Sequence, residues 1–471
     1  MSRSTVAAVV ADGLARAGAS RVFAAPGASP IVVDAARVHG LAIVETAGAT
    51  AACVMAAVTA ELVDAPGVAL VSLAGTLASV IDGAAHATRD RAAVIMISDG
   101  AADARLLEPV VKATVGADPV SAGHWIAHAA QLCMADPRGA VHLVVAAGVA
   151  EAPALPVGTA CRRAPVPAPA ADVLDALADA IARAARPVLI AGLETGPDDA
   201  KWLRALAESV PAPVLTTPKG KGALPDPHPL ALGLLAAGHP LLAQSDLLIV
   251  VGLDPVEVSP GVWPRGVPTV RVARAPHEDA VIGEIALVIE ELAPRLRGRA
   301  RADWDVAALD RLKRGLGAVA PGPGLARRRV VEIARDMTPA GTRLALDVPL
   351  AAAWPSVAPR ECLVPNGVAT LGFALPAALA AALAHDDARV VAIGAAAGFA
   401  AMAGEWRTAA RLGAPVVAVA LNHAGATDVT TAAGAAGVAV TTAGDEASFR
   451  AAFERAWRAG TPMLVDAHVS R

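Results

Sequence analysis

Continuous runs of apolar residues, each about the length of one strand, recur along the whole chain. They lack the alternation of apolar and polar residues that marks a strand with one face in water. A strand that is apolar on both faces is typical of a parallel sheet between two layers of helices. The runs that we predict as strands are residues 68–72, 93–97, 141–145, 188–191, 214–216, 247–251, 344–346, 390–393 and 416–421.

Two stretches rich in proline, glycine or basic residues divide these strands into three groups. Residues 153–170 are typical of a linker, and residues 296–324, which end in Pro-Gly-Pro-Gly, indicate a second connection. A chain of 471 residues is long enough for about two to three domains. We therefore predict an α/β protein with three doubly wound parallel-sheet domains, at residues 1–152, 171–295 and 325–471.

The apolar segments are too short to cross a membrane, which needs roughly 18–20 apolar residues. Near the N-terminus Val6, Val10 and Leu14 have helical spacing, and Ser4 or Thr5 precedes them as a capping residue. Charged residues interrupt this apolar segment, unlike the core of a signal peptide. We expect a capped helix there and no membrane partner.

Charge and cysteine content exclude several classes of protein. The formal net charge is −4, which gives no attraction to nucleic acid or to an anionic membrane surface. The four cysteines are scattered without a CxxC pair or the spacing of a metal site, so we expect reduced thiols and a cytoplasmic protein. No GxGxxG follows a predicted strand, which argues against a dinucleotide such as FAD.

The most informative segment is residues 391–423, in which a buried strand, a loop, a helix and a second buried strand follow one another. It resembles the metal–diphosphate motif of the thiamine diphosphate enzymes, which opens with GDG, has a Glu in its middle and closes with two Asn. Aligned without gaps, GDG falls on Ala395–Ala397, the Glu is Glu405, and the Asn pair is Asn422 and His423. Similarity covers nearly the whole chain, including RPVLIAG at residues 186–192 and PNGVATLGFALPAALAAAL at residues 365–383. The chain thus resembles the acetolactate synthase, pyruvate oxidase and 2-oxo acid decarboxylase type of this family.

This resemblance implies a fold and a cofactor site. The family has a pyrimidine-binding domain, a central Rossmann-like domain and a diphosphate-binding domain, in that order. By the same resemblance, Glu45 contacts N1′ of the aminopyrimidine, Ala369 offers its backbone carbonyl to the 4′-amino group, and Leu371 forces the V-shaped conformation of the cofactor. The residues that the resemblance places at thiamine diphosphate are Pro26, Gly27, Glu45, Ser72, Ala369, Leu371, Ala396, Ala397, Gly398 and His423.

The ligands of the divalent ion are the part of the motif that differs most. In the family the Asp of GDG and the second Asn hold the ion, and here these positions are Ala396 and His423. Mg²⁺ prefers hard oxygen ligands, which a methyl group and an imidazole do not provide, whereas imidazole suits Zn²⁺. Asp428, a few residues further on, is a second candidate ligand. Mg²⁺ is the metal that the resemblance implies, and His423 and Asp428 are the candidate ligands here.

Two functions follow from the resemblance. The first is a thiamine diphosphate-dependent lyase or carboligase that acts on a 2-oxo acid, in a homo-oligomer whose site lies between the first domain of one subunit and the third domain of another. The second is a degenerate member that has lost the metal and the cofactor and serves as a binding or regulatory subunit, or as a repurposed enzyme. Four changes favour this alternative: those at Ala396 and His423, Ser79 in place of an Asn, and residues 74–76 (Ala-Gly-Thr) in place of Gly-Pro-Gly. An oxidoreductase that uses the central domain is a third alternative.

Substrate recognition leaves few traces in the sequence. Lys112 and His124 lie in the region where relatives place substrate contacts, and surface or core roles are open for both. The substrate is therefore predicted only as a 2-oxo acid, from the resemblance.

Overall fold

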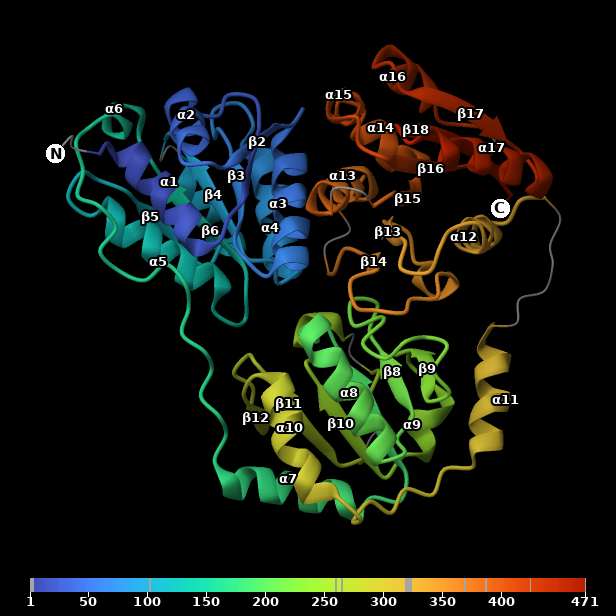
Figure 1. Ribbon diagram of the computed structural model, residues 1–471. Coiled ribbons are helices and arrows are strands. Elements are labelled where there is room, and N and C mark those ends of the chain that lie inside the picture. The colour runs from blue at the N-terminus through green and yellow to red at the C-terminus, as the bar shows by residue number, and fades with distance from the viewer. Residues whose placement is uncertain are drawn as a thin grey trace.

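The computed structural model describes residues 4–100, 103–258, 261–263, 266–317, 324–367, 370–385, 388–423 and 425–470. Figure 1 shows three lobes, each built around one sheet of six strands with helices packed on it. The first sheet is formed within residues 21–144, the central sheet within 187–282 and the third within 343–469. Every strand pair in the described part of the chain is parallel. The predicted α/β class with three parallel sheets is confirmed.

The first lobe alternates strands and helices. Thr5 caps its first helix as expected, because its hydroxyl oxygen accepts a hydrogen bond from the Ala8 backbone N–H at 3.2 Å. The strands are β1 (Arg21–Ala24), β2 (Ala42–Glu45), β3 (Gly67–Leu70), β4 (Val94–Ser98), β5 (Thr114–Gly116) and β6 (Ala140–Val144). The helices are α1 (Val6–Ala17), α2 (Pro30–Val38), α3 (Ala49–Val63), α4 (Leu77–Arg89), η1 (Ala104–Val110), α5 (Ala122–Met134) and α6 (Ala147–Ala150).

The central lobe has the strand order β12-β11-β10-β7-β8-β9, which is the doubly wound order of Rossmann-like sheets. Its strands are β7 (Pro187–Ala191), β8 (Val214–Thr216), β9 (Ala231–Leu234), β10 (Leu247–Val251), β11 (Thr269–Ala273) and β12 (Ala280–Ile282). Its helices are α7 (Ala171–Arg183), α8 (Pro197–Ser209), α9 (Pro240–Gln244), η2 (Pro255–Glu257) and α10 (Ile285–Leu296). The second predicted connection is not plain coil, since α11 (Val306–Gly317) forms within it.

The third lobe repeats the topology of the first. Its order β14-β13-β15-β16-β18-β17 corresponds strand by strand to β2-β1-β3-β4-β6-β5. The strands are β13 (Arg343–Leu346), β14 (Cys362–Leu363), β15 (Val390–Ala395), β16 (Val416–His423), β17 (Ala439–Ala443) and β18 (Met463–Val469). The helices are α12 (Arg327–Asp336), η3 (Ala351–Ala353), α13 (Ala374–Ala384), α14 (Ala396–Ala401), α15 (Glu405–Leu412), α16 (Thr430–Ala435) and α17 (Glu446–Ala459).

This topology marks two places where a ligand is expected. In the first sheet the strand order reverses direction between β1 and β3, and in the third sheet between β13 and β15. Loops that follow the carboxyl ends of the strands at such a switch point form the usual ligand crevice of an open α/β sheet.

The first and third lobes share one hydrophobic core. Helices α3 and α4 face α13 across the boundary between the lobes (Figure 1). The cluster between them contains Met55 from α3, Val80 from α4 and Leu379 from α13, all fully buried. Helices α1, α2 and α5 belong to a separate cluster on the other side of the first sheet. The two lobes are therefore one packed unit in the single chain.

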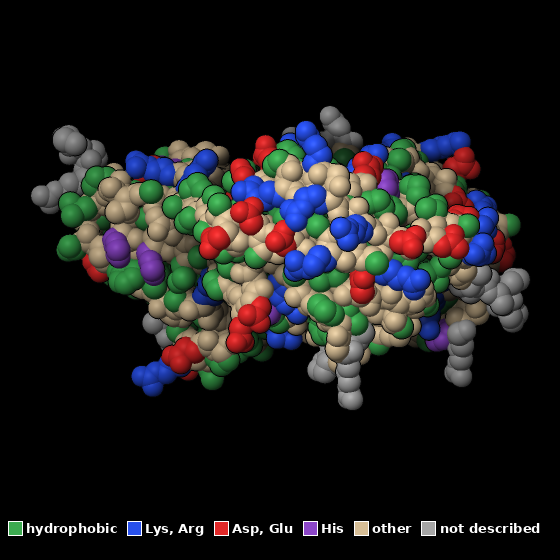
Figure 2. Space-filling view, turned by 90° about the horizontal axis from the view of Figure 1, so that it is seen from below, with side chains coloured by type: hydrophobic (Ala, Val, Ile, Leu, Met, Phe, Trp, Pro, Cys, Tyr) green, Lys and Arg blue, Asp and Glu red, His purple; other side chains and the backbone are tan. Residues whose placement is uncertain are grey.

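The surface agrees with the low net charge. On the face shown in Figure 2, basic and acidic side chains are interspersed. No helix in the described ranges is long and apolar enough to cross a membrane. The four cysteines are free and buried.

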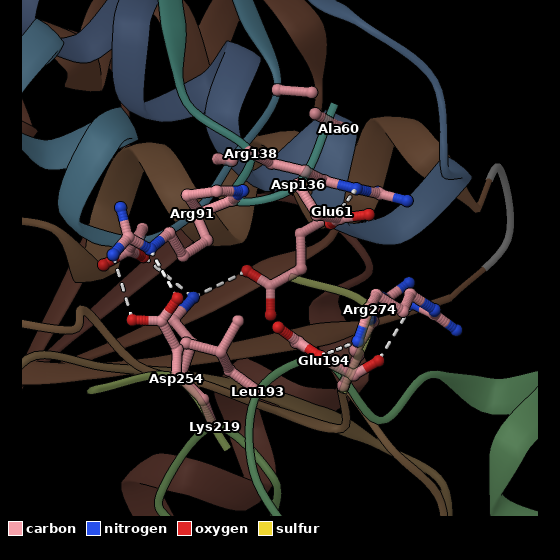
Figure 3. A pocket seen from close by; sticks show the side chains of 15 residues that line it. Ala60, Glu61, Arg91, Asp136, Arg138, Leu193, Glu194, Lys219, Asp254 and Arg274 are labelled. Atoms are coloured by element: carbon pink, nitrogen blue, oxygen red, sulfur yellow. Dashed lines mark hydrogen bonds and ion pairs between the residues drawn. The ribbon is translucent and has the colours of Figure 1, made fainter. Parts of the chain in front are cut away.

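A buried charge cluster joins the lobes, and Figure 3 shows Lys219 directed from the central lobe toward Glu61 of the first. The Lys219 ammonium lies 2.8 Å from Glu61 Oε2 and 2.8 Å from Asp90 Oδ2. Burial alone would lower the pKa of Lys219, but the two carboxylates more than reverse this and raise it. Asp90 also accepts a hydrogen bond from the Asn366 backbone N–H of the third lobe. All three lobes therefore meet at Asp90.

Candidate functional site at the carboxyl edges of the first and third sheets

Glu45 is the last residue of β2, where its Cα pairs with that of Ala24 in β1. Its side chain is 71% exposed, and Arg411 Nη1 lies 3.6 Å from its Oε2. The Arg411 guanidinium also donates a hydrogen bond to the Glu45 backbone carbonyl. The Glu45 carboxylate thus stands at the carboxyl edge of the first sheet, beside α15 and open to a ligand or to a second subunit.

Glu405, the central Glu of the motif, holds the loop that follows Glu45. Its Oε1 accepts a hydrogen bond from the Ala47 backbone N–H at 2.9 Å, although the two residues are 358 positions apart. Glu405 is 2% exposed, and burial raises the pKa of its carboxyl group. Because Gly48 caps α3, this carboxyl group lies at the positive end of the α3 dipole. Its contacts are structural and fix the Glu45 loop.

Pro26, Gly27 and Ser72 come together at the switch point of the first sheet. Pro26 and Gly27 form the exposed turn after β1, and Ser72 follows β3 and is 8% exposed. Gly27 has a φ of +81°, and a Cβ added there would lie 3.1 Å from the Ser72 Cβ. Both the left-handed backbone and the close approach favour glycine at this position. The structure thus gathers three of the predicted cofactor residues at one edge.

Leu371 precedes α13, and its side chain is 57% exposed. The adjacent Gly372 has a φ of +83°, and a Cβ added to it would lie 2.4 Å from the Gly398 carbonyl oxygen. This contact places the Leu371 turn against the beginning of α14. Ala369, which the resemblance also places at the cofactor, lies outside the described residues.

The GDG-equivalent residues lie at the switch point of the third sheet. Ala395 ends β15, and Ala396 and Ala397 begin α14 without the intervening loop that we expected. Ala396 is 4% exposed, Ala397 is exposed and Gly398 is buried. Asp347, directly after β13, accepts a hydrogen bond from the Ala395 backbone N–H at 3.1 Å. Burial raises the pKa of Asp347 to about 6.

Asn422 and His423 end β16 and are engaged within the third lobe. The Asn422 side-chain amide donates to the Thr427 carbonyl at 2.8 Å and to Asp466 Oδ1 at 2.9 Å. His423 is exposed, and its Nδ1 lies 3.1 Å from the Val469 carbonyl oxygen. Asn422 therefore shapes the loop after β16, and His423 is the member of the pair that is open to water.

Family models match all three lobes in order. They are "Thiamine pyrophosphate enzyme, N-terminal TPP binding domain" over residues 4–114, "Thiamine pyrophosphate enzyme, central domain" over 174–289, and "Thiamine pyrophosphate enzyme, C-terminal TPP binding domain" over 347–427. The chain belongs to the thiamine pyrophosphate enzyme family. The predicted resemblance is thereby confirmed.

Relatives of this thiamine pyrophosphate family member include synthases and decarboxylases. The acetolactate synthase of Bacillus subtilis is 27% identical over 462 residues, which cover 88% of this chain and 81% of that protein. A probable 2-ketoarginine decarboxylase of Pseudomonas aeruginosa is 33% identical over 240 residues, which cover 46% of this chain and 42% of that protein. The solved structure of a thiamine diphosphate-dependent 4-hydroxybenzoylformate decarboxylase of Rhodococcus jostii has a TM-score of 0.85 at 21% identity and covers 99% of both chains. The last comparison shows a common fold.

The metal site of the thiamine pyrophosphate enzymes does not fit the residues present here. Ala396 has no ligand atom, and the described ranges contain no group of three or more His, Cys, Asp or Glu that could hold an ion. Asp428 instead lies just before α16, where its Oδ1 accepts hydrogen bonds from the Thr430 and Thr431 backbone N–H groups at 3.0 and 3.1 Å. A hydrogen bond from the Thr431 hydroxyl, together with these, lowers the pKa of Asp428 to about 2. His423 and Asp428 remain predicted metal ligands. No third ligand joins them in a group among the described residues.

The region in which substrate contacts were expected has other contacts. Lys112 Nζ donates hydrogen bonds to the carbonyls of Leu132, Ala135 and Pro137 at 2.7, 2.6 and 2.9 Å. Lys112 thus satisfies backbone carbonyls at and beyond the C-terminal end of α5. His124 is exposed on α5, which belongs to the core cluster on the other side of the first sheet from α3 and α4.

Asp347 and Arg411 are residues of the site that sequence reasoning missed. Asp347 directly follows a buried strand, and an acid at the carboxyl end of a parallel strand is a signal that could have identified it. Arg411 gives no such signal, because it is a helix-surface arginine that meets Glu45 only through tertiary packing.

Proposed function

We propose that this protein is a thiamine diphosphate-dependent lyase or carboligase that acts on a 2-oxo acid. The observation that carries the proposal is the exposed Glu45 carboxylate at the carboxyl edge of the first sheet, in the position of the family's aminopyrimidine-binding Glu. A synthase and a decarboxylase among the relatives support the two reaction classes.

A site completed by a second copy of the chain fits the exposure of its parts. Leu371 leaves a large apolar side chain 57% exposed, and Glu45 is likewise open to solvent. Covering Leu371 would remove apolar surface from water, which is favourable. We infer a homo-oligomer in which the first lobe of one copy and the third lobe of another enclose the cofactor.

The chain's own residues would position and shield the cofactor. Glu45 would hydrogen-bond a ring nitrogen of the aminopyrimidine, while Arg411 and Glu405 hold the Glu45 loop in place. When bound, thiamine diphosphate supplies the carbanion chemistry, and the protein supplies orientation and electrostatics. A second copy over Glu45 would exclude water and so strengthen its interaction with the ring.

The diphosphate end distinguishes this protein from the family's motif. Ala396 is buried and has no ligand atom. One oxygen of the Asp347 carboxyl group accepts a hydrogen bond from the Ala395 N–H. We therefore propose that cofactor binding here does not require Mg²⁺, and we assign no catalytic step to a metal ion.

The absence of a ligand atom at Ala396 also favours a second candidate function. Burying a diphosphate without a counter-ion is costly unless backbone N–H groups or cationic side chains replace it. A member that has lost the cofactor would serve as a binding or regulatory subunit, or as an enzyme with other chemistry in this crevice.

Calorimetry with thiamine diphosphate separates the two candidates. The enzyme proposal predicts binding, together with release of CO₂ from a small 2-oxo acid such as pyruvate, and loss of CO₂ release in Glu45→Gln. Glu290→Gln, which removes the same charge from the exposed surface of α10, is the matched control and should behave as wild type. Absence of heat and of a thermal shift at millimolar cofactor would reject the enzyme proposal and favour the second candidate.

A further inference from the structure

Helix α5 presents two histidines on the outer surface of the first lobe. His124 and His128 are four positions apart, so they are neighbours on one face of the helix, and both side chains are exposed. Their rings are nearly parallel, at 7°, with centroids 6.1 Å apart. Trp125 contacts both rings, at centroid distances of 5.1 and 5.8 Å. Ring contacts therefore hold the two imidazoles side by side.

The ring nitrogens of this pair have no partner among the residues that the structure describes. Neither imidazole makes a hydrogen bond or an ion pair with another residue in the described part of the chain. Other histidines differ, since His142 Nε2 lies 2.9 Å from the Ser98 hydroxyl and His468 Nε2 lies 3.1 Å from an Asp466 carboxylate oxygen. A ligand of the pair would therefore break no hydrogen bond or ion pair with the described residues.

We propose that His124 and His128 chelate a divalent transition-metal ion of the Cu²⁺, Ni²⁺ or Zn²⁺ type. Imidazole nitrogen suits these ions, and among them Cu²⁺ binds a given nitrogen site most tightly. Two histidines at positions i and i+4 of one helix are spaced so that both reach one ion. To bind one Zn²⁺ ion, both exposed side chains would rotate out of this parallel arrangement, so that a nitrogen of each ring lies about 2.0–2.1 Å from the ion.

The site is open and lies apart from the cofactor crevice. No third His, Cys, Asp or Glu forms a ligand group with the pair within the described ranges, so water completes the coordination. Helix α5 packs with α1 in the core cluster of one side of the first sheet, whereas α3 and α4 face the third lobe (Figure 1). The inference therefore does not depend on the proposed function.

Trp125, one of the seven tryptophans in the chain, contacts both imidazoles, so its part of the fluorescence can report metal binding. Titration of the metal-free, full-length protein with CuCl₂, followed by calorimetry and tryptophan fluorescence, should give one tight equivalent that quenches fluorescence. His124→Ala and His128→Ala should each weaken Cu²⁺ binding by about 10²-fold, because a second linked ligand acts at high effective concentration. Both side chains are exposed, so circular dichroism should show an intact fold.

A spacing variant makes the test specific. Gln131→His combined with His128→Ala keeps the number of histidines but separates them by seven positions, about 10.5 Å along the helix, which is too far for one ion. This variant should bind Cu²⁺ as weakly as His128→Ala. The proposal is overturned by tight binding in the spacing variant, by unchanged affinity in the double variant His124→Ala/His128→Ala, or by the absence of quenching in the wild type.

Discussion

Replacing Lys219 with Met should lower the free energy of unfolding, because Lys219 lies at the junction where the three lobes meet. The Lys219 side chain is 4% exposed and lies 2.8 Å from both Glu61 Oε2 and Asp90 Oδ2. Met fills a similar volume without a charge, so the variant leaves two carboxylates close together with no cation between them. Breaking a buried ion pair in this way costs about 3–5 kcal/mol. Because the Glu61 side chain retains 18% exposure and can gain water, we expect the lower end, about 3 kcal/mol.

In urea unfolding, this loss of stability should appear as a lower midpoint concentration of urea with a similar m-value. Arg204→Met is the control, since the Arg204–Glu208 pair is 55% and 47% exposed and ion pairs so exposed contribute little to stability. Adding Glu61→Gln and Asp90→Asn to Lys219→Met should recover part of the stability, because the two carboxylates that Lys219 neutralises then carry no charge. A loss below about 1 kcal/mol in Lys219→Met, or no recovery in the triple variant, would refute the reasoning.

Three further outcomes concern the third lobe. Gly372→Ala should destabilise it by about 1–3 kcal/mol, because φ is +83° and the new Cβ would lie 2.4 Å from a carbonyl oxygen; an unchanged Tm would contradict this. Burial raises the pKa of Asp347 from 3.8 to about 6, so its contribution to stability is full below about pH 4 and is lost as the pH rises through about 6. The free energy of unfolding should therefore fall less steeply with pH over this range in Asp347→Asn than in the wild type. Identical slopes would disprove the raised pKa of Asp347. Ala396→Asp combined with His423→Asn should make cofactor binding Mg²⁺-dependent, by about tenfold or more in calorimetry, and Mg²⁺ without effect would argue against it.

Three of the four inner strands in each sheet were predicted, because both of their faces are covered, whereas the inner strands β1, β11 and β18 were not. β4 and β10 are buried at every position, and apart from Ser98 at the end of β4 they appear in the sequence as uninterrupted apolar runs. Edge strands gave no such signal. β2 and β17 contain exposed and half-buried positions, and an edge strand with one side toward water has a composition close to that of a loop.

The candidate site was predictable only where single segments carry it. The positions of Glu45, Ser72 and Leu371 followed from motifs within one stretch of chain each. The contact of Glu405 with Ala47 and the ion pairs of Lys219 depend on how whole lobes pack against each other. Contacts of this kind join residues more than a hundred positions apart, and no local pattern encodes them.

The most direct test of the central proposal is calorimetry of the intact wild-type protein with thiamine diphosphate, once in EDTA and once in Mg²⁺. We predict binding with the same affinity in both, because the position of the metal-binding Asp is the buried Ala396. A gain in affinity of about tenfold or more on addition of Mg²⁺ would contradict this prediction.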